Sequence, residues 1–555
     1  MATSRTECFE KTFLKNMNFL WETKRTDDLY AKAIPIRRGD GGFVVPLAQL
    51  HARDPRLKNG TWFQLSESKT VFGDTLTTEA LASYSAQSPD KIFVIEDASQ
   101  NKVALVSVSF KSVSDLSLQF QSMTMLESAR ETAKEGFEFL CRWLEETTVN
   151  ESLLISRKAV KDEGFLESCG FRPDGEFLKL FHSQSDLGKQ DILTAGPTIS
   201  SQENSYVLDS TRYGWNSEWS KYIKRFESEF ADYIGVKHAL GTSSCTGALH
   251  IAFKALGIGP GDEVIVPEMT WVATASAVTY VGAKPVFADI DPKNWCIDPD
   301  KIEALITPKT KCIVPVHVYG HPADMDRVME IANRHGLYVV EDAAPSIGAE
   351  CRGRKTGSFG HFAAFSFQGA KLLVTGEGGM LTTNDPELYK RAYAIWDHGR
   401  TPGTFWINEV GVKYKMSNST AALGLGQLQR CEEQVHAKRR IWNWYNEEFK
   451  DFDGISLWTE SSWARSIYWM SSLTLNPKWN VSRDHLFAEL KKRKIDTRPT
   501  FPAISQYPMW DSAENPVAKG VGEWGVNLPS GVCLKEHQVR YVAQSIKEIM
   551  TAGRK

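Results

Sequence analysis

The chain has 555 residues and a formal net charge of -3, and 42% of its residues are hydrophobic and 24% charged. These values are typical of a soluble globular protein with about two to four domains, and they exclude the strongly basic surface that attracts nucleic acids or anionic membranes. The partners that we expect are therefore small molecules and other proteins, with no nucleic acid and no membrane.

The cysteines and the N-terminal sequence indicate the compartment. Nine cysteines are scattered along the chain and none forms a C-x-x-C pair, which argues for a reducing compartment and against a structural zinc site. The first 28 residues carry charges throughout, and no later window is as long and as apolar as a membrane span. We therefore expect a cytoplasmic protein without a metal centre.

Residues 1–190 predict a separate α/β domain. The stretch 91–110 predicts two strands joined by a turn. The stretch RETAKEGFEFLCRWLEE, residues 130–146, places its apolar residues on one face of a helix. A short strand is expected at 152–157, and another helix and strand at 160–177.

A polar stretch that contains Gly, Pro and Ser ends this domain, and we place the linker at residues 191–205. Residues 206–420 predict alternating strands and helices with short connections, which is the pattern of a mostly parallel sheet covered on both faces. Residues 421–555 begin with one long amphipathic helix, expected over 420–449, and predict a smaller α+β domain. The fold class that we expect is α/β.

The larger domain predicts a regular order of elements. They are a helix that ends at 257, a strand at 263–267, a helix at 274–283, a strand at 284–290, a helix at 298–306, a strand at 311–320, a helix at 324–336 and a strand at 337–344. Ligands of such sheets bind at the carboxyl ends of the strands, so functional residues are expected there.

One lysine stands out in the stretch SFQGAKLLVTGEGG, residues 366–379. Lys371 lies among apolar residues just before a run of glycines. A buried ammonium must be paired, deprotonated or used in a covalent bond, because removing it from water is costly. We interpret Lys371 as an amine that reacts with an aldehyde.

Residues at other predicted strand ends complete a site for pyridoxal phosphate. Residues 243–247 start a helix whose N–H groups can hold a phosphate, although simple N-capping is the better explanation of this segment when it is taken alone. Asp342 can hold a ring N–H, while a helix cap or a metal ligand is the better explanation of a lone aspartate. Trp271 offers a face for the ring or fills the core. With Ser366 and Lys371, these residues supply what the cofactor requires.

Residues 206–555 resemble the DegT/DnrJ/EryC1/StrS sugar-aminotransferase family of fold-type-I pyridoxal phosphate enzymes, which includes the perosamine synthases. The segments that carry the resemblance include LGIGPGDEVIVPEMTWVATASAV, GAKPVFADID, VEDAAPSIGA, SFQGAKLLVTGEGGML and KYKMSNSTAALGLGQL. The resemblance implies that Lys371 holds the cofactor aldehyde and moves the proton. It also implies that Asp342 contacts the ring nitrogen and that Trp271 stacks on the ring.

The same resemblance implies that Cys245, Thr246 and Ser366 hold the phosphate, and that the enzyme is a homodimer whose sites are completed by the partner chain. Three positions depart from the pattern of the family. Cys245 replaces the usual glycine of the phosphate loop. Lys413 stands where many members have an asparagine that reaches the neighbour's phosphate, and Pro345 stands where many have His or Gln beside the cofactor.

The segment IDTRPTF, which contains Arg498, and YWM at 468–470 most resemble the perosamine synthases. This implies transfer of an amino group from L-glutamate to C4, rather than C3, of a nucleotide-linked 4-keto-6-deoxy sugar. Arg498 and Trp215 are the candidate substrate-binding residues, with a packed loop as the alternative for Trp215. A related dehydratase would carry histidine in place of Lys371, and a non-catalytic regulatory protein of this fold would lack Lys371 or Asp342.

Residues 1–190 resemble the acetyltransferase fold of the GNAT superfamily, in the order of their elements and in the Cys169-Gly170-Phe171 element. The resemblance implies acetyl-CoA binding and a bifunctional enzyme that acetylates the product amine. That superfamily binds the pyrophosphate with a glycine-rich loop before a helix. Here the corresponding stretch, MLESARETAKEG, has no glycine before Gly136 and contains glutamates. The alternative is a degenerate domain that packs, binds sugar or assists assembly.

Overall fold

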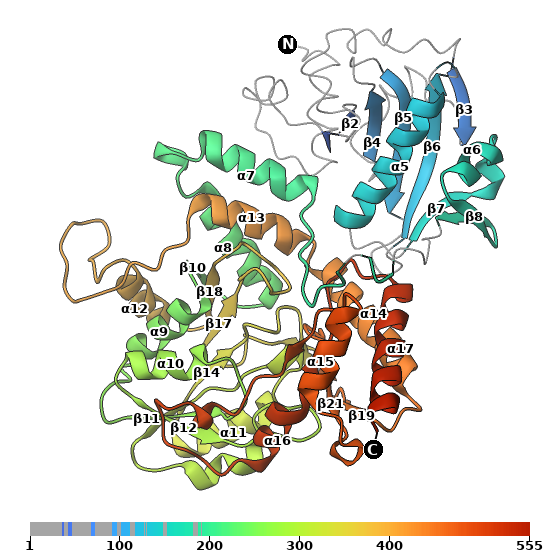
Figure 1. Ribbon diagram of the computed structural model, residues 1–555. Coiled ribbons are helices and arrows are strands. Elements are labelled where there is room, and N and C mark those ends of the chain that lie inside the picture. The colour runs from blue at the N-terminus through green and yellow to red at the C-terminus, as the bar shows by residue number, and fades with distance from the viewer. Residues whose placement is uncertain are drawn as a thin grey trace. The chain divides into compact units, whose positions relative to one another are not determined.

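The structure is a computed structural model that describes residues 36–37, 43–46, 68–72, 91–96, 102–110, 117–126, 128, 130–147, 152–180, 187–189 and 191–554 (Figure 1). The chain divides into two compact units, which are residues 1–185 with 198–206 and residues 186–197 with 207–555. No helix within these described ranges is long and apolar enough to cross a membrane. In the same ranges, no group of three His, Cys, Asp or Glu side chains is placed to hold a metal ion.

Unit 1 is built on a nine-stranded sheet in the order β1-β2-β4-β5-β6-β7-β9-β8, with β3 paired to β6. Its strands are β1 (Ile36–Arg37), β2 (Phe43–Pro46), β3 (Ser68–Phe72), β4 (Lys91–Glu96), β5 (Lys102–Phe110), β6 (Ser117–Leu126), β7 (Ser152–Ser156), β8 (Phe171–Asp174) and β9 (Phe177–Leu180). The parallel strands β6 and β7 require a crossover, which α5 (Arg130–Thr147) provides. Helix α6 (Glu163–Ser168) precedes β8.

A small aromatic core fixes α5 on this sheet. The Phe137 ring of α5 lies 5.0 Å from the Phe120 ring of β6 and 6.0 Å from the Phe171 ring of β8, measured between ring centres. Such contacts between tilted and stacked rings are favourable beyond the area that they bury. The apolar face that the sequence predicts for residues 130–146 is therefore the face of α5 that packs against the sheet of unit 1.

The larger part of unit 2 is a seven-stranded sheet in the order β10-β18-β17-β14-β13-β11-β12. Its strands are β10 (His238–Thr242), β11 (Glu263–Pro267), β12 (Lys284–Ala288), β13 (Thr310–Ile313), β14 (Tyr338–Asp342), β17 (Phe362–Ser366) and β18 (Gly379–Thr383). β18 is antiparallel to both of its neighbours, while β12, β11, β13, β14 and β17 are parallel. The predicted α/β class with a mostly parallel sheet is confirmed.

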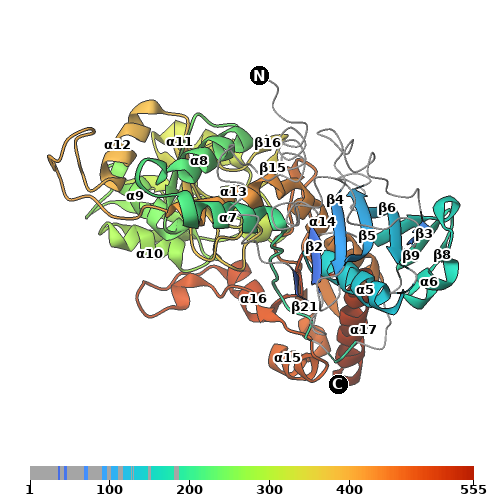
Figure 2. The ribbon, with the colours of Figure 1, turned by 90° about the horizontal axis from the view of Figure 1, so that it is seen from above.

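Helices cover both faces of this sheet. They are α8 (Lys221–Ile234), α9 (Cys245–Ala255), α10 (Ala273–Tyr280), α11 (Met325–His335), α12 (Pro386–Trp396) and α13 (Asn418–Gln429), and α7 (Ser201–Tyr213) precedes them in the chain. Helices α9, α10 and α12 pack on one face, where Phe362 lies in the core. On the other face, α8 and α13 lie side by side (Figure 2), and the Phe230 ring of α8 is 4.9 Å from the Phe365 ring. Side chains alternate along β17, so Phe362 and Phe365 serve opposite cores.

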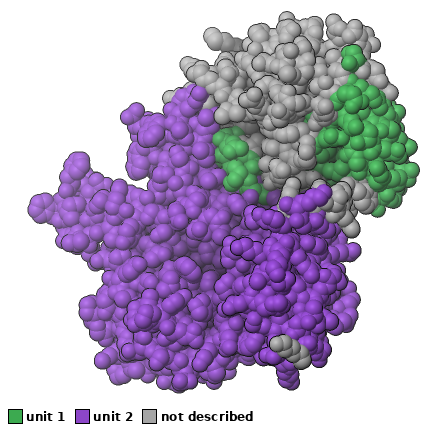
Figure 3. Space-filling model, viewed as in Figure 1, with its two compact units in different colours: residues 1–185, 198–206 green, residues 186–197, 207–555 purple. Residues whose placement is uncertain are grey.

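Unit 2, which Figure 3 colours purple, ends in a smaller lobe of helices around a four-stranded sheet in the order β19-β21-β23-β22. Its elements are α14 (Cys431–Phe449), β19 (Ile455–Leu457), β21 (Ser472–Leu475), α15 (Arg483–Lys492), β22 (Arg498–Pro499), α16 (Pro516–Trp524), β23 (Gly525–Asn527) and α17 (Glu536–Gly553). A three-stranded sheet of β16 (Arg354–Lys355), β15 (Glu350–Cys351) and β20 (Ala464–Arg465) links the two parts.

Two of the predicted elements are less regular than expected. Residues 298–306 form two short 3-10 turns instead of an α-helix. The strand expected at 311–320 ends at Ile313. Pro315 has no N–H to give to a neighbouring strand, so regular pairing stops there, although Val316 keeps an isolated parallel bridge with Asp342.

Two further differences concern helices. The long helix expected over 420–449 is broken into α13 and α14 at Arg430, where φ is -111°. Helix α7 begins at Ser201, inside the stretch that we place as a linker at 191–205. The start of α7 was not predicted, because residues 201–205 are polar and show no apolar periodicity.

Candidate active site

A cavity of about 680 Å³ lies at the carboxyl edge of the seven-stranded sheet in unit 2. Its walls come from the start of α9, from the residues that follow β11, β14 and β17, and from segments of the smaller lobe. The residues that line it include Thr194, Ser244, Cys245, Thr246, Thr270, Trp271, Tyr319, Asp342, Pro345, Ser366, Gln368, Lys371, Glu377, Trp469, Arg498, Phe501 and Asn527. Open parallel sheets bind their ligands at this edge.

Lys371 lies in the turn that follows β17, where its backbone N–H donates to the Gln368 carbonyl at 2.8 Å. Its Nζ is 3.9 Å from the centre of the Trp469 ring, which is a cation–π distance. Burial lowers the pKa of Lys371, while Asp342 and Cys245 act in the opposite direction. A lysine in such surroundings gives up its proton more readily than an exposed lysine, as an amine that attacks a carbonyl must.

Asp342 ends β14, and its carboxylate is buried. The Thr274 hydroxyl donates to Asp342 Oδ2 at 2.7 Å, and the Ala344 N–H donates to Oδ1 at 3.2 Å. Cys245 Sγ lies 4.0 Å from Oδ1. These contacts are all with uncharged groups, so the carboxylate keeps its capacity to bind a protonated ring nitrogen.

The start of α9 forms the anion-binding end of the cavity. Ser244 caps the helix, since its hydroxyl accepts from the Gly247 N–H at 3.0 Å. The first N–H groups of a helix have no intrahelical acceptor, and Cys245 and Thr246 line the cavity at this point. A Cβ on Gly379 would lie 2.5 Å from the Ser244 carbonyl carbon, so β18 can pass the helix start only with glycine there. Capping and phosphate binding are therefore compatible in this segment.

Ser366 and Trp271 complete the group. Ser366 ends β17 and lines the cavity. Trp271 follows β11 and is 58% exposed, although it forms part of the cavity wall. An aromatic face that remains open in a concave site is suited to stacking on a flat ligand. An amine, a buried carboxylate, a helix start and an open aromatic face thus share one cavity, and this donor set fits pyridoxal phosphate.

Two of the residues that the sequence singles out lie elsewhere in this chain. Lys413 lines a second hollow of about 800 Å³ together with Arg400. Trp215 is 63% exposed, and its indole N–H donates to the Thr211 carbonyl at 2.8 Å. Arg498 lines the same cavity as Lys371. The structure therefore brings all the predicted cofactor residues except Lys413 into one cavity. Of the two predicted substrate residues, Arg498 lies in this cavity and Trp215 does not.

Aromatic residues and a threonine of the site were not found from the sequence. Tyr319 has a φ of 51°, and its ring stacks on the Phe501 ring with 5.1 Å between centres and 20° between planes. The Trp469 ring lies 6.0 Å from the Tyr319 ring, and its N–H donates to the Ala370 carbonyl at 2.7 Å. The segment YWM contains Trp469, but only the fold shows that the ring meets Lys371. Thr274 likewise carries no local signal.

The sheet and the residues at its carboxyl edge define a transferase of fold type I that uses pyridoxal phosphate. Residues 197–547 match the DegT/DnrJ/EryC1/StrS aminotransferase family. The chain is 40% identical over 371 residues to the GDP-perosamine synthase of Caulobacter vibrioides, which covers 66% of this chain and 100% of that protein. It is 36% identical to a UDP-N-acetyl-3-dehydro-α-D-glucosamine 3-aminotransferase of Acidithiobacillus ferrooxidans, which covers 59% of this chain and 88% of that protein.

Solved structures agree with these matches. The structure of DesI with its TDP-sugar product has a TM-score of 0.62 and 30% identity, and covers 66% of this chain and 94% of that one. The PLP form of Spr1654 from Streptococcus pneumoniae has a TM-score of 0.62 and 27% identity, and covers 65% of this chain and 99% of that one.

The chain belongs to the DegT/DnrJ/EryC1/StrS aminotransferase family. The predicted family and the predicted enzyme class are thus confirmed, and pyridoxal phosphate is the cofactor of this class. The family match begins at residue 197, so it does not bear on the acetyltransferase fold expected for residues 1–190.

Proposed function

We propose that this enzyme transfers an amino group from L-glutamate to C4 of a nucleotide-linked 4-keto-6-deoxy sugar. The observation that carries the proposal is the meeting of Lys371, Asp342 and Trp271 in one cavity. The name of the Caulobacter relative supports a perosamine-type product, and the resemblance around Arg498 supports C4. Amination at C3 is the competing assignment, because one relative is named as a 3-aminotransferase.

Each residue of the cavity has a role in this proposal. Lys371 binds the aldehyde carbon of pyridoxal phosphate, Asp342 accepts from its ring nitrogen, and Trp271 covers one face of its ring. The phosphate is bound by the residues Cys245, Thr246 and Ser366. When bound, the cofactor supplies an electron sink for the carbon that loses a proton. Once the amine of the donor has displaced it from the aldehyde carbon, the Lys371 Nζ would be free to take the α-proton of the donor, and later to give a proton to the carbon of the sugar that was a carbonyl.

We further propose that a second copy of the chain completes the site. Lys413 lies outside the cavity of its own chain. The nearby loop exposes large apolar side chains, with Phe405 95%, Trp406 71% and Val410 86% exposed. Exposed apolar patches of this kind mark protein interfaces. In a homodimer, this loop would be covered and Lys413 would reach the phosphate of the neighbouring site. Six of the described cysteines are free thiols, which supports a cytoplasmic location; they are Cys169, Cys245, Cys296, Cys312, Cys351 and Cys431.

The direct test is product formation. Purified enzyme is incubated with L-glutamate and either a GDP-linked or a dTDP-linked 4-keto-6-deoxy sugar, and the products are separated and identified by mass and by NMR. We expect an amino group at C4 of one of these sugars. Conversion of a 3-keto sugar nucleotide instead, with the 4-keto sugars unchanged, would contradict the assignment.

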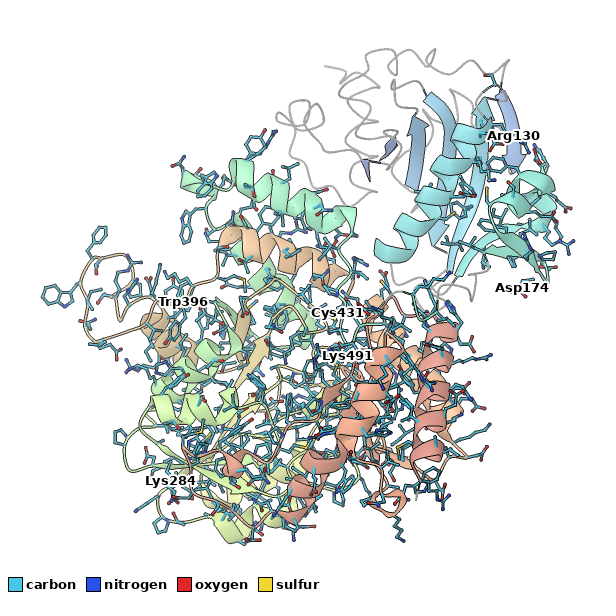
Figure 4. All side chains as sticks on the ribbon, in the orientation of Figure 1. Arg130, Asp174, Lys284, Trp396, Cys431 and Lys491 are labelled. Atoms are coloured by element: carbon cyan, nitrogen blue, oxygen red, sulfur yellow. The ribbon has the colours of Figure 1, made fainter. Side chains whose placement is uncertain are left out.

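The second candidate is a bifunctional enzyme whose unit 1 acetylates the product amine with acetyl-CoA. The parallel pair β6 and β7 with α5 between them supports the acetyltransferase resemblance. Against it, α5 has Glu131 in its first turn, and Arg130 at its start (labelled in Figure 4) pairs with Asp162 at 2.8 Å. The carboxylates of Glu131 and Asp162 do not favour a pyrophosphate at this helix start.

Acetyl-CoA binding separates the bifunctional enzyme from a degenerate domain. A rise in Tm with added acetyl-CoA, but not with coenzyme-free buffer, supports catalysis by unit 1. An unchanged Tm supports the degenerate domain.

A further inference from the structure

The segment that precedes the family match forms part of the cavity wall. Ile192 makes a parallel bridge with Ile495, and its carbonyl accepts from the Asp496 N–H at 2.9 Å. Two residues later, Thr194 lines the cavity and is 5% exposed. The Thr194 carbonyl accepts from the Ser530 N–H at 3.0 Å. Residues 192–194 are thus held against two segments of the smaller lobe.

One carboxylate connects this segment to a cation in the cavity. The N–H of Thr194 donates to Asp496 Oδ2 at 3.2 Å, and the Thr194 hydroxyl donates to the same oxygen at 2.5 Å. The other oxygen, Asp496 Oδ1, accepts from the guanidinium of Arg498. Both oxygens of the carboxylate therefore have defined partners, and its orientation is fixed by Thr194 on one side and by Arg498 on the other.

Arg498 keeps donors available for a ligand. In the part of the chain that the structure describes, its guanidinium uses Nη1 for Asp496 and for the Thr497 carbonyl at 3.1 Å. The side chain is 63% exposed and lines the cavity. Its Nε and Nη2 groups form no hydrogen bond within the described residues. A guanidinium with such donors binds a carboxylate or a phosphate through paired N–H groups.

We propose that Thr194 is a positioning residue which, through Asp496, orients Arg498 toward an anionic group of the substrate. The Asp496 side chain is only 25% exposed, and without the Thr194 hydroxyl its Oδ2 keeps only the weaker donor, the Thr194 N–H at 3.2 Å. Arg498 is then less restricted in the free enzyme, so it loses more conformational entropy when the ligand fixes it in one orientation. The inference rests on the proposed function, which supplies two sources of the anion: the carboxylates of the amino donor and the diphosphate of the nucleotide sugar.

The test compares Thr194→Val, which removes the hydroxyl and keeps the shape, with Thr194→Ser, which keeps the hydroxyl. The full chain loaded with pyridoxal phosphate is titrated with L-glutamate while its visible absorbance is followed, and GDP binding is measured by calorimetry. We expect Thr194→Val to raise at least one dissociation constant about tenfold, as for loss of a hydrogen bond to a charged group, and Thr194→Ser to restore it.

Arg498→Gln identifies the anion. If Thr194 acts through Arg498, both variants must raise the same dissociation constant, either that for L-glutamate or that for GDP. A rise for glutamate identifies a carboxylate, and a rise for GDP identifies the diphosphate. The matched control is Thr382→Val in β18, a buried threonine whose hydroxyl donates to the Gly357 carbonyl at 3.1 Å. This control is expected to leave both constants unchanged.

The proposal is overturned if Thr194→Val leaves both constants at the wild-type values, if Thr382→Val raises them equally, or if Arg498→Gln raises neither. A wild-type protein that shows no absorbance change with glutamate contradicts the proposed function instead. In that case, the GDP titration still decides whether Thr194 acts through Arg498.

Discussion

At the scale of single residues, the chemistry of the cavity depends on what surrounds Lys371 and Asp342. Burial lowers the pKa of Lys371, which favours a neutral amine, while the Trp469 ring at 3.9 Å stabilises its ammonium form. Asp342 is held by the Thr274 hydroxyl and by backbone N–H, not by a cationic side chain. These surroundings suit Lys371 to react with the aldehyde of the cofactor and suit Asp342 to accept from its ring nitrogen.

Removing the hydroxyl of Thr274 tests the role of Asp342. Thr274→Val leaves Asp342 Oδ2 without its 2.7 Å donor, so the carboxylate can turn away from the ring nitrogen. We expect the dissociation constant for pyridoxal phosphate, measured by absorbance after dialysis, to rise about tenfold. Thr274→Ser retains the hydroxyl and is expected to bind as the wild type does. Equal affinity in Thr274→Val would mean that Asp342 does not depend on this contact.

At the scale of elements, α14 is joined to the cavity by a buried lysine. Lys438 is 4% exposed, and its Nζ donates to the Trp469 carbonyl at 2.8 Å and to the Ser530 carbonyl at 2.5 Å. Burial alone lowers its pKa from the usual 10.5 to about 7. A neutral amine has two N–H donors, which these two carbonyls satisfy. α14 thus holds in place the segment that brings Trp469 to Lys371.

The lowered pKa of Lys438 predicts how stability changes with pH. Between pH values of about 7 and 10.5, the unfolded chain binds a proton at this lysine that the folded chain does not. The free energy of unfolding therefore rises with pH across this window, by about 1.4 kcal/mol per pH unit for one group. Lys438→Met removes this contribution, so urea unfolding should show a smaller increase from neutral to alkaline pH than in the wild type.

The control for this measurement is Lys390→Met. Lys390 is 70% exposed and pairs with Glu387 on the surface of α12. This variant is expected to keep the wild-type dependence on pH. A Lys438→Met protein with the same increase as the wild type would show that Lys438 is protonated to the same extent in the folded and unfolded chains.

The contact between β18 and α9 gives a second prediction for an element. Gly379→Ala would place a Cβ 2.6 Å from the Cys245 nitrogen, so the start of α9 must move. We expect the dissociation constant for pyridoxal phosphate to rise, because its phosphate is bound less tightly. Inorganic phosphate is expected to compete less well with the cofactor for the same reason. Gly520→Ala is the control, since a Cβ at that position of α16 meets nothing within 4 Å. Unchanged affinity in Gly379→Ala would contradict the placement of the phosphate.

At the scale of the whole molecule, the sequence predicted the sheet but not the contacts between distant segments, and the roles of the reactive residues stay predictions. The strand at 263–267 and the helix from Cys245 follow from local apolar patterns and caps, which are properties of neighbouring residues. The break at Arg430 was missed because the apolar pattern continues through it. Prolines limited the strand at 311–320, although the sequence contained the signal.

The sequence placed a residue in the cavity where that residue stands at or after a strand end, as Lys371, Asp342 and Trp271 do. Thr194 and Trp469 could not be found in this way, because each joins the cavity through pairing with residues that are far away in the chain. Thr194 lies 302 positions from Asp496, with which it shares two hydrogen bonds. Such contacts are set by the completed fold and leave no pattern in the local sequence.

The most direct test of the account is the visible absorption spectrum of the purified enzyme, before and after addition of L-glutamate, beside Lys371→Ala and the surface control Lys390→Ala. We predict that the wild type and the control are yellow and lose this colour with glutamate, and that Lys371→Ala lacks the absorbance of the lysine-bound cofactor. A wild-type protein that stays colourless after incubation with pyridoxal phosphate, or a Lys371→Ala protein with the wild-type spectrum, would contradict the central role of Lys371.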